Sequence, residues 1–163
     1  MNCLRKTMAF MLSIIGMVSM FSGCSRDPAG NAEKDVPISD ITEKLKSDLT
    51  WVDSMRQLED SVIEKWYSFD SEKVESCEVY VAETGATAEE IAVVKLSDKS
   101  GLSDVEEIMQ KRVDKRKKEF ENYVPSEMYK LENAVITNHG NYAALIICDD
   151  FEKAGDVFEE CFK

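Results

Sequence analysis

The sequence predicts an α+β domain in which a four-stranded antiparallel sheet, built from two hairpins, is covered by helices, with two of the helices at its N-terminal side. Two observations predict this class. Apolar residues recur at helical spacing in some stretches and alternate, or run continuously, in shorter ones. The predicted order along the chain is helix, helix, strand, strand, helix, strand, strand, helix, which is typical of helices layered on an antiparallel sheet.

Two helices are expected at the start of the domain. The first follows a capping residue at Ser39 or Asp40, and the second follows one at Asp53 or Ser54. A charged connector over residues 70–76 then leads into the first strand. The apolar stripe of the first helix is Ile38, Ile41, Leu45 and Leu49, and that of the second is Met55, Leu58, Val62 and Trp66.

Four short segments are expected as strands. The first alternates apolar and polar residues, the second is almost continuously apolar, and a loop that contains Gly85 joins them as a hairpin. The third and fourth flank Asn138-His139-Gly140-Asn141, which is typical of a tight hairpin turn. The four segments are residues 77–82, 91–96, 134–137 and 142–148.

Two helices remain. The longest is expected over residues 102–123, because Ser103 and Glu106 have the spacing of a capping box and Pro125 ends the helical pattern. The last helix is expected to begin after Asp149-Asp150. The apolar stripe is Val105, Ile108, Met109, Val113 and Phe120 in the longest helix, and Phe151, Ala154, Phe158 and Cys161 in the last.

The first 23 residues have the features of a secretion signal. Arg5 and Lys6 precede an apolar stretch, residues 7–21, that is shorter than the roughly twenty residues of a membrane-spanning helix but suits a signal peptide. The run Phe21-Ser22-Gly23-Cys24 then resembles the cleavage site of bacterial lipoproteins. We therefore expect a lipoprotein signal peptide over residues 1–23 and lipid, including palmitate, on Cys24. An ordinary signal peptide followed by an incidental cysteine is the alternative.

Residues 24–37 are expected to form a lipidated flexible tether. Pro28, Gly30 and Pro37 interrupt a small, polar segment that has no periodicity. A single α+β domain over residues 38–163 follows, which we expect to be monomeric. This organisation would hold the domain by its lipid anchor at the extracellular face of the cytoplasmic membrane.

The charge of the chain bears on its partners. Removal of residues 1–23 takes away Arg5 and Lys6 and no acid, which moves the formal net charge from −12 to −14. A surface this acidic repels the phosphates of DNA and RNA. We therefore expect no nucleic-acid partner.

No catalytic constellation is recognisable in the sequence. His139 is the only histidine and falls in a predicted turn, and no GxSxG nucleophile motif occurs. Glu83, Glu89 and Glu90 border one loop without the regular oxygen spacing of a calcium loop, so neither a metal nor a cofactor is expected.

Three cysteines fall within the predicted domain. Cys77, Cys148 and Cys161 stand among apolar residues, which favours a place in the core over a nucleophilic role. A Cys77–Cys148 or Cys148–Cys161 disulfide remains open as an alternative.

The longest predicted helix carries a cluster of basic residues, although the chain as a whole is acidic. Arg112 and Arg116 lie one helical turn apart, and with Lys115 they are candidate anion-binding residues. The plainer interpretation is a solvated face that pairs with nearby acids. Within it we expect Arg112, which is nearer the apolar stripe, to be structural, and Arg116 to be solvated. The cluster comprises Lys111, Arg112, Lys115, Arg116, Lys117 and Lys118.

The segment Gly85-Ala86-Thr87-Ala88-Glu89-Glu90-Ile91-Ala92-Val93-Val94-Lys95 is similar to one found in a lipoprotein family of clostridial and related Gram-positive bacteria. Val105 with Arg112, Tyr123 with Pro125, and Gly140-Asn141-Tyr142 add to a resemblance that covers residues 67–158. The family is catalogued only as a domain of unknown function. The resemblance implies a small exported lipoprotein, assigns no catalytic residue, and associates the chain with surface-polymer acylation.

Two classes of function follow from these observations. The first is a non-catalytic binding or accessory module of the cell envelope, whose partner is an envelope protein or polymer. The second is an envelope-acting enzyme that modifies a surface polymer with carboxylates such as Glu89 and Glu90. The lack of a recognisable set of nucleophile, base and orienting group favours the first class.

Overall fold

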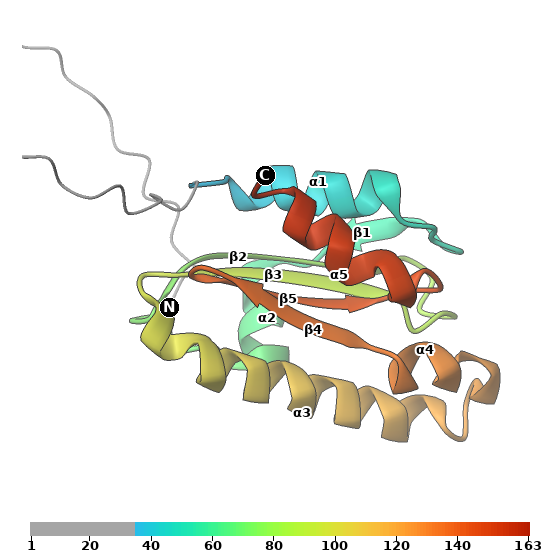
Figure 1. The fold of residues 1–163 in the computed structure, drawn as a ribbon. Helices are drawn as coiled ribbons and strands as arrows, with labels where there is room; N and C mark the ends of the chain where they lie inside the picture. Colours follow the sequence, from blue (N-terminus) through green and yellow to red (C-terminus); the bar gives the residue numbers. More distant parts are fainter. Residues whose placement is uncertain (1–34) are drawn as a thin grey trace, which may run out of the picture.

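The computed structural model describes residues 35–163; the predicted signal peptide, Cys24 and most of the predicted tether lie outside them. The described chain forms an antiparallel sheet with helices on both faces (Figure 1). The strands are β1 (Met55–Gln57), β2 (Val74–Ala82), β3 (Glu90–Leu96), β4 (Val135–His139) and β5 (Tyr142–Ile147). The helices are α1 (Ile38–Asp48), α2 (Asp60–Tyr67), α3 (Leu102–Phe120), α4 (Met128–Glu132) and α5 (Phe151–Glu160). Two short 3₁₀ turns, Lys99–Gly101 and Pro125–Glu127, precede α3 and α4.

The sheet has the strand order β1-β2-β3-β5-β4, and every neighbouring pair is antiparallel. The two predicted hairpins are β2–β3 and β4–β5, and they join through β3 and β5, where Val93 stands opposite Ala144. In the second hairpin Gly140 takes a φ of 61°, a conformation that glycine adopts without strain. The predicted α+β class and the antiparallel sheet are confirmed.

The expectation of four strands is wrong, because the sheet has a fifth. Met55 was expected to begin the apolar stripe of a helix, but Met55–Gln57 form β1 and pair with the end of β2, Met55 opposite Ala82. Pairing there satisfies backbone groups along what would otherwise be an open sheet edge. The helix that follows, α2, begins only at Asp60.

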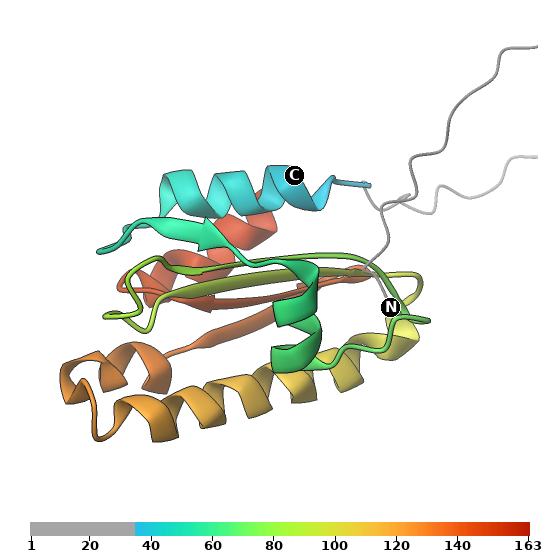
Figure 2. The ribbon, with the colours of Figure 1, turned by 180° about the vertical axis from the view of Figure 1, so that it is seen from behind.

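The helices form one layer on each face of the sheet (Figures 1 and 2). On the first face α1 and α5 cover Ile91 and Val93 of β3. On the second face α2 and α3 cover Ala92, Val94 and Leu96 of the same strand. Both faces of β3 are therefore buried, which explains why its residues 91–94 are all apolar and do not alternate with polar ones.

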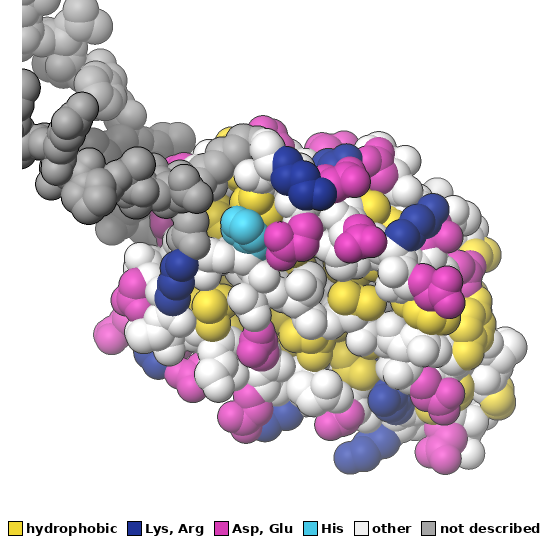
Figure 3. All heavy atoms as spheres, in the orientation of Figure 1, with side chains coloured by type: hydrophobic (Ala, Val, Ile, Leu, Met, Phe, Trp, Pro, Cys, Tyr) yellow, Lys and Arg dark blue, Asp and Glu magenta, His cyan; other side chains and the backbone are white. Residues whose placement is uncertain are grey.

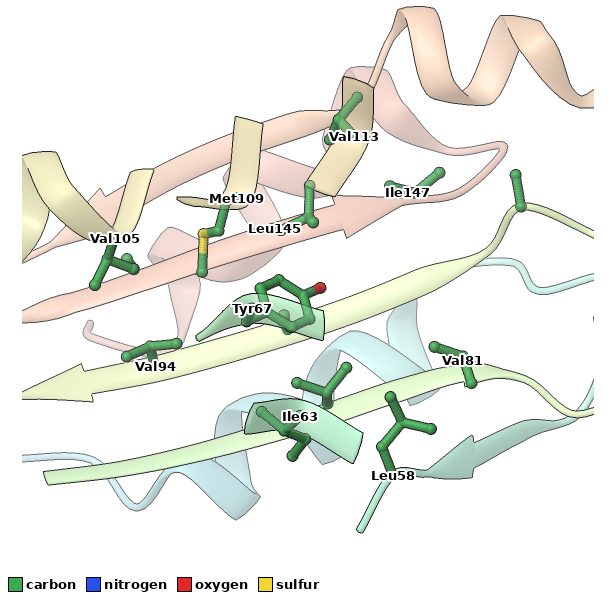
Figure 4. Packing of buried hydrophobic residues seen from close by; sticks show 14 of the residues in the cluster. Leu58, Ile63, Tyr67, Val81, Val94, Val105, Met109, Val113, Leu145 and Ile147 are labelled. Atoms are coloured by element: carbon green, nitrogen blue, oxygen red, sulfur yellow. The ribbon is translucent and has the colours of Figure 1, made fainter. Parts of the chain in front are cut away.

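The second face has the longer helix. Val105, Met109 and Val113 point from α3 toward the sheet, where Leu145 of β5 lies beneath them (Figure 4). The spacing of these three residues is helical, as the sequence predicts, but α3 ends at Phe120, before Tyr123.

The first described residues are fastened to the domain. The backbone N–H of Val36 donates a hydrogen bond to the Tyr142 hydroxyl at 3.0 Å, and that hydroxyl lies 2.7 Å from an Asp35 carboxylate oxygen. The Nζ of Lys95 lies 2.9 Å from the same carboxylate. Val36 is buried, so the end of the predicted tether packs against the sheet.

No helix in residues 35–163 combines the length and the apolar character that crossing a bilayer requires.

Candidate functional site

The most unusual chemistry of the domain lies at one end of β3, where two consecutive glutamates are fully buried. Glu89, directly before β3, and Glu90, the first residue of β3, both have no solvent exposure, although the four residues that follow them are apolar. A buried charge is costly unless it is paired and hydrogen-bonded. The partners of the two glutamates come from different helices.

Glu90 pairs with α3. Arg112 donates to it through Nε at 2.9 Å and through Nη2 at 2.8 Å, which is the two-point geometry that a guanidinium and a carboxylate favour. The Tyr67 hydroxyl at the end of α2 donates a further hydrogen bond to Glu90. The guanidinium of Arg112 lies 4.1 Å from the centre of the Trp66 ring, a cation–π contact.

The titration of these groups follows from that geometry. Burial alone would lower the pKa of Arg112, but the charge of Glu90 and its hydrogen bonds outweigh burial, so the pKa of Arg112 is raised. Burial, with the negative charge of Glu90, raises the pKa of Tyr67 well above its usual value. Arg112 is therefore charged and Tyr67 neutral across the physiological pH range.

Arg116 lies beside this pair but fits it less well. Its Nε is buried, makes no hydrogen bond, and stands 3.7 Å from the Glu90 carboxylate. Its Nη2 makes a long contact of 3.4 Å to the Thr87 carbonyl oxygen. Burial lowers the pKa of Arg116, the charge of Glu90 opposes that effect, and the charge of Arg112 adds to it.

Glu89 pairs with α4. The ammonium of Lys130, whose side chain is 1% exposed, lies 3.1 Å from Glu89 Oε1. The backbone N–H groups of Val52 and Asp53 donate to the same carboxylate at 2.8 and 3.1 Å, and the Thr87 hydroxyl donates at 3.0 Å. Glu89 thus ties together the segment before β1, the β2–β3 loop and α4.

Lys130 faces two further carboxylates. Its Nζ lies 3.2 Å from Glu127 and 3.6 Å from Asp149, so three acids surround one ammonium. The Tyr129 hydroxyl is hydrogen-bonded to Asp149. Burial, together with the charges of Glu89 and Glu127, raises the pKa of Asp149.

The loop between β2 and β3 is held at both of its ends. Asp53 accepts hydrogen bonds from the backbone N–H of Thr84, at 3.0 Å, and from its hydroxyl. At the other end Glu127 accepts the backbone N–H of Ala88 at 3.0 Å. Residues 83–86 of this loop are exposed. The loop therefore presents a fixed backbone to solvent.

The arrangement offers little for acid–base or nucleophilic chemistry. The Glu89 and Glu90 carboxylates are enclosed and fully occupied by donors, and burial raises the pKa of the Cys148 thiol to about 11. Within residues 35–163, no disulfide joins Cys148 to Cys77 or to Cys161. His139 lies 2.9 Å from Glu159 and stacks on Phe162. No group of three or more potential metal ligands is found in residues 35–163.

The site residues predicted from the sequence differ in where the structure places them. Cys24 lies outside the described residues. Arg112 is buried and paired, as expected for a structural residue, whereas Lys115 is exposed. Arg116 was expected to be solvated, but its side chain is only 13% exposed. An anion site formed by Arg112, Lys115 and Arg116 stays a prediction, with Arg112 already engaged by Glu90.

Sequence reasoning missed Lys130 and Tyr67 as partners of buried carboxylates. The available signal was the pair Glu89-Glu90 directly before a continuously apolar strand, because a charge next to a doubly buried strand needs a counter-ion. Which lysine or arginine supplies it depends on the docking of α3 and α4.

Residues 49–148 match the family model described as Domain of unknown function (DUF4358). The chain belongs to this family. The match agrees with the resemblance carried by residues 85–95, to a family catalogued only as a domain of unknown function. The DUF4358 region contains both buried ion pairs, whereas α1 and α5 lie outside it. Searches of curated proteins and of solved structures found no match.

Proposed function

We propose that this DUF4358 protein is an exported, lipid-anchored protein that acts as a non-catalytic binding or accessory module of the cell envelope. The Cys24 motif supports the anchor and the export. The acidic composition supports a domain that stays clear of nucleic acids and of anionic lipid headgroups.

The observation that carries the non-catalytic role is the burial of the two glutamates. A catalytic carboxylate must come within hydrogen-bond reach of its substrate. Glu89 and Glu90 are 0% exposed and are held by Lys130 and Arg112. They are the carboxylates that the enzymatic alternative would use, and their contacts are those of structural residues.

The anchor is tested by labelling cells with palmitate. Wild-type chain should incorporate the label, and Cys24→Ala should abolish it and leave the precursor uncleaved. Cys3→Ala, which removes another cysteine before the expected cleavage site, is the matched control and should label normally. Label that persists in Cys24→Ala would overturn the lipoprotein assignment.

The binding role is tested in intact cells. Chemical crosslinking followed by purification of the anchored chain should give one reproducible complex with another envelope component. Purified chain that alters an isolated surface polymer on its own, and loses this activity in Glu90→Gln while remaining folded, would establish the enzymatic alternative.

A further inference from the structure

The two ends of the sheet are in contact with different parts of the chain. The described chain begins at Asp35, which is fastened at the end of the sheet where Lys95 of β3 stands opposite Tyr142 of β5. The same two strands reach their other end at the pair Glu90 and Ile147. Five residues of strand, about 17 Å, separate these ends. The lipid anchor would therefore hold the Asp35 end toward the membrane and the Glu90 end away from it.

Exposed apolar side chains lie at the end away from Asp35. Val52 is 65% exposed, Tyr123 is 78% exposed and Tyr129 is 43% exposed, and these are the exposed large hydrophobic residues of the described chain. Val52 follows α1, Tyr123 follows α3, and Tyr129 is in α4 (Figure 1). Figure 3 shows hydrophobic and acidic side chains together at that end of the molecule. We call Val52, loop residues 83–86, Tyr123, Tyr129 and Asp149 the distal surface.

Hydrogen bonds and ion pairs connect Val52, loop residues 83–86, Tyr129 and Asp149 of the distal surface. Val52 and Lys130 both bind Oε1 of Glu89, and Lys130 also reaches Asp149, the partner of the Tyr129 hydroxyl. The β2–β3 loop is fixed by Asp53 and by Glu127. A surface that is already ordered loses little conformational freedom when it binds a partner.

The charge of the distal surface selects the partner. Three carboxylates surround the single ammonium of Lys130, so this cluster carries an excess of negative charge. Asp149 is 31% exposed and accepts a hydrogen bond from the hydroxyl of Tyr129, which is 43% exposed, so a cation that approaches Asp149 also comes close to an aromatic ring. A second copy docked by twofold symmetry would instead bring the same acids together, which is unfavourable.

We propose that the distal surface binds a segment of another envelope protein in which a lysine or arginine stands among apolar side chains. The basic side chain docks between Asp149 and Tyr129, and the apolar ones cover Val52 and Tyr123. The inference rests on the proposed anchored binding role and specifies the site and the partner chemistry.

The test uses the full chain in its own envelope, with a photo-crosslinking residue in place of Val52 or Tyr123. The matched controls carry it in place of Glu107 or Asp156, which are exposed on the outer sides of α3 and α5. We expect one protein to be captured from both distal positions, at least about fivefold more than from the controls. The captured peptide should contain a lysine or arginine flanked by apolar residues.

The charge contact is tested in the same cells with Asp149→Asn, which should lower the adduct yield on the order of tenfold. Asp156→Asn removes an exposed acid elsewhere and should leave the yield unchanged. Thermal unfolding of both variants separates lost binding from lost folding. An unchanged yield in a folded Asp149→Asn variant would overturn the proposal.

The remaining outcomes separate this inference from the function on which it rests. Adducts that form only at the Glu107 or Asp156 positions would overturn the distal surface and leave the binding role standing. Distal adducts with a second copy, with lipid, or with an acidic segment would overturn the proposed partner. No adduct at any position would contradict both.

Discussion

The Glu90 carboxylate and the Arg112 guanidinium meet at 2.9 and 2.8 Å inside the domain, with side chains that are 0% and 2% exposed. The pair joins the start of β3 to the middle of α3. Removal of one member of a buried pair leaves the other charge without a counter-ion, which costs far more than the pair contributes when it is intact.

Arg112→Ala is therefore expected to lower the free energy of unfolding by about 3–5 kcal/mol, because Glu90 stays buried and is left with Arg116 as its cation, whose Nε is 3.7 Å away and makes no hydrogen bond. Lys111→Ala is the control: this exposed neighbour pairs with Glu107 one turn away and should cost less than about 0.5 kcal/mol. Urea unfolding monitored by circular dichroism measures both. If both variants lost the same small amount of unfolding free energy, this would show that solvent reaches Glu90.

Lys130→Met should also destabilise the domain by about 3–5 kcal/mol, because Glu89 loses its only ammonium and keeps neutral donors. The matched control is Lys153→Met, which removes an exposed lysine from a pair with Asp150 and should cost less than about 1 kcal/mol. Thermal unfolding compares the variants. A wild-type melting temperature for Lys130→Met would contradict a structural role for this contact.

Asp149→Asn is expected to stabilise the domain slightly at pH 7. Burial and neighbouring acids raise the pKa of Asp149 in the folded state. Stability is therefore greatest below the unfolded-state pKa of about 3.9 and is lost as pH rises through the folded-state pKa. The gain at pH 7 should be under about 1 kcal/mol because the side chain is 31% exposed. Unfolding curves at pH 3 should show no gain.

Tyr142→Phe should loosen the attachment of the first described residues. The N–H of Val36 loses its acceptor, at a cost of about 1–2 kcal/mol, and Asp35 keeps only its contact with Lys95. Tyr123→Phe, which changes an exposed tyrosine, should have no effect. Hydrogen exchange at the Val36 amide measures the change directly, and full protection in Tyr142→Phe would contradict the expectation.

Much of the fold could be predicted from local patterns. The stripe Val105, Met109 and Val113 identifies α3, and the turn at Gly140 identifies the second hairpin. β1 was missed because it is three residues long and Met55 continues a helical spacing with Leu58. A strand that short forms only because β2 offers it an edge, which is a tertiary effect.

The site was less accessible to sequence reasoning. Glu90 and Arg112 are 22 residues apart, and Glu89 and Lys130 are 41 apart. No spacing rule on a single helix or strand relates residues at such distances. The sequence could show that Arg112 lies near an apolar stripe, but the carboxylate it meets depends on how α3 crosses the sheet.

The junction of the two hairpins at β3 and β5 bears on how the protein could be divided. A cut in the exposed residues 97–100 would give one fragment with α1, α2 and β1–β3, and another with α3–α5, β4 and β5. Each helix layer draws on both fragments, since α1 packs with α5 and α2 with α3. Neither fragment could form a complete hydrophobic core alone. Each exposes a strand edge, β3 in the first and β5 in the second, that pairs with the other. The domain is thus suited to fragment complementation, in which two halves fused to separate envelope proteins refold only when those proteins meet.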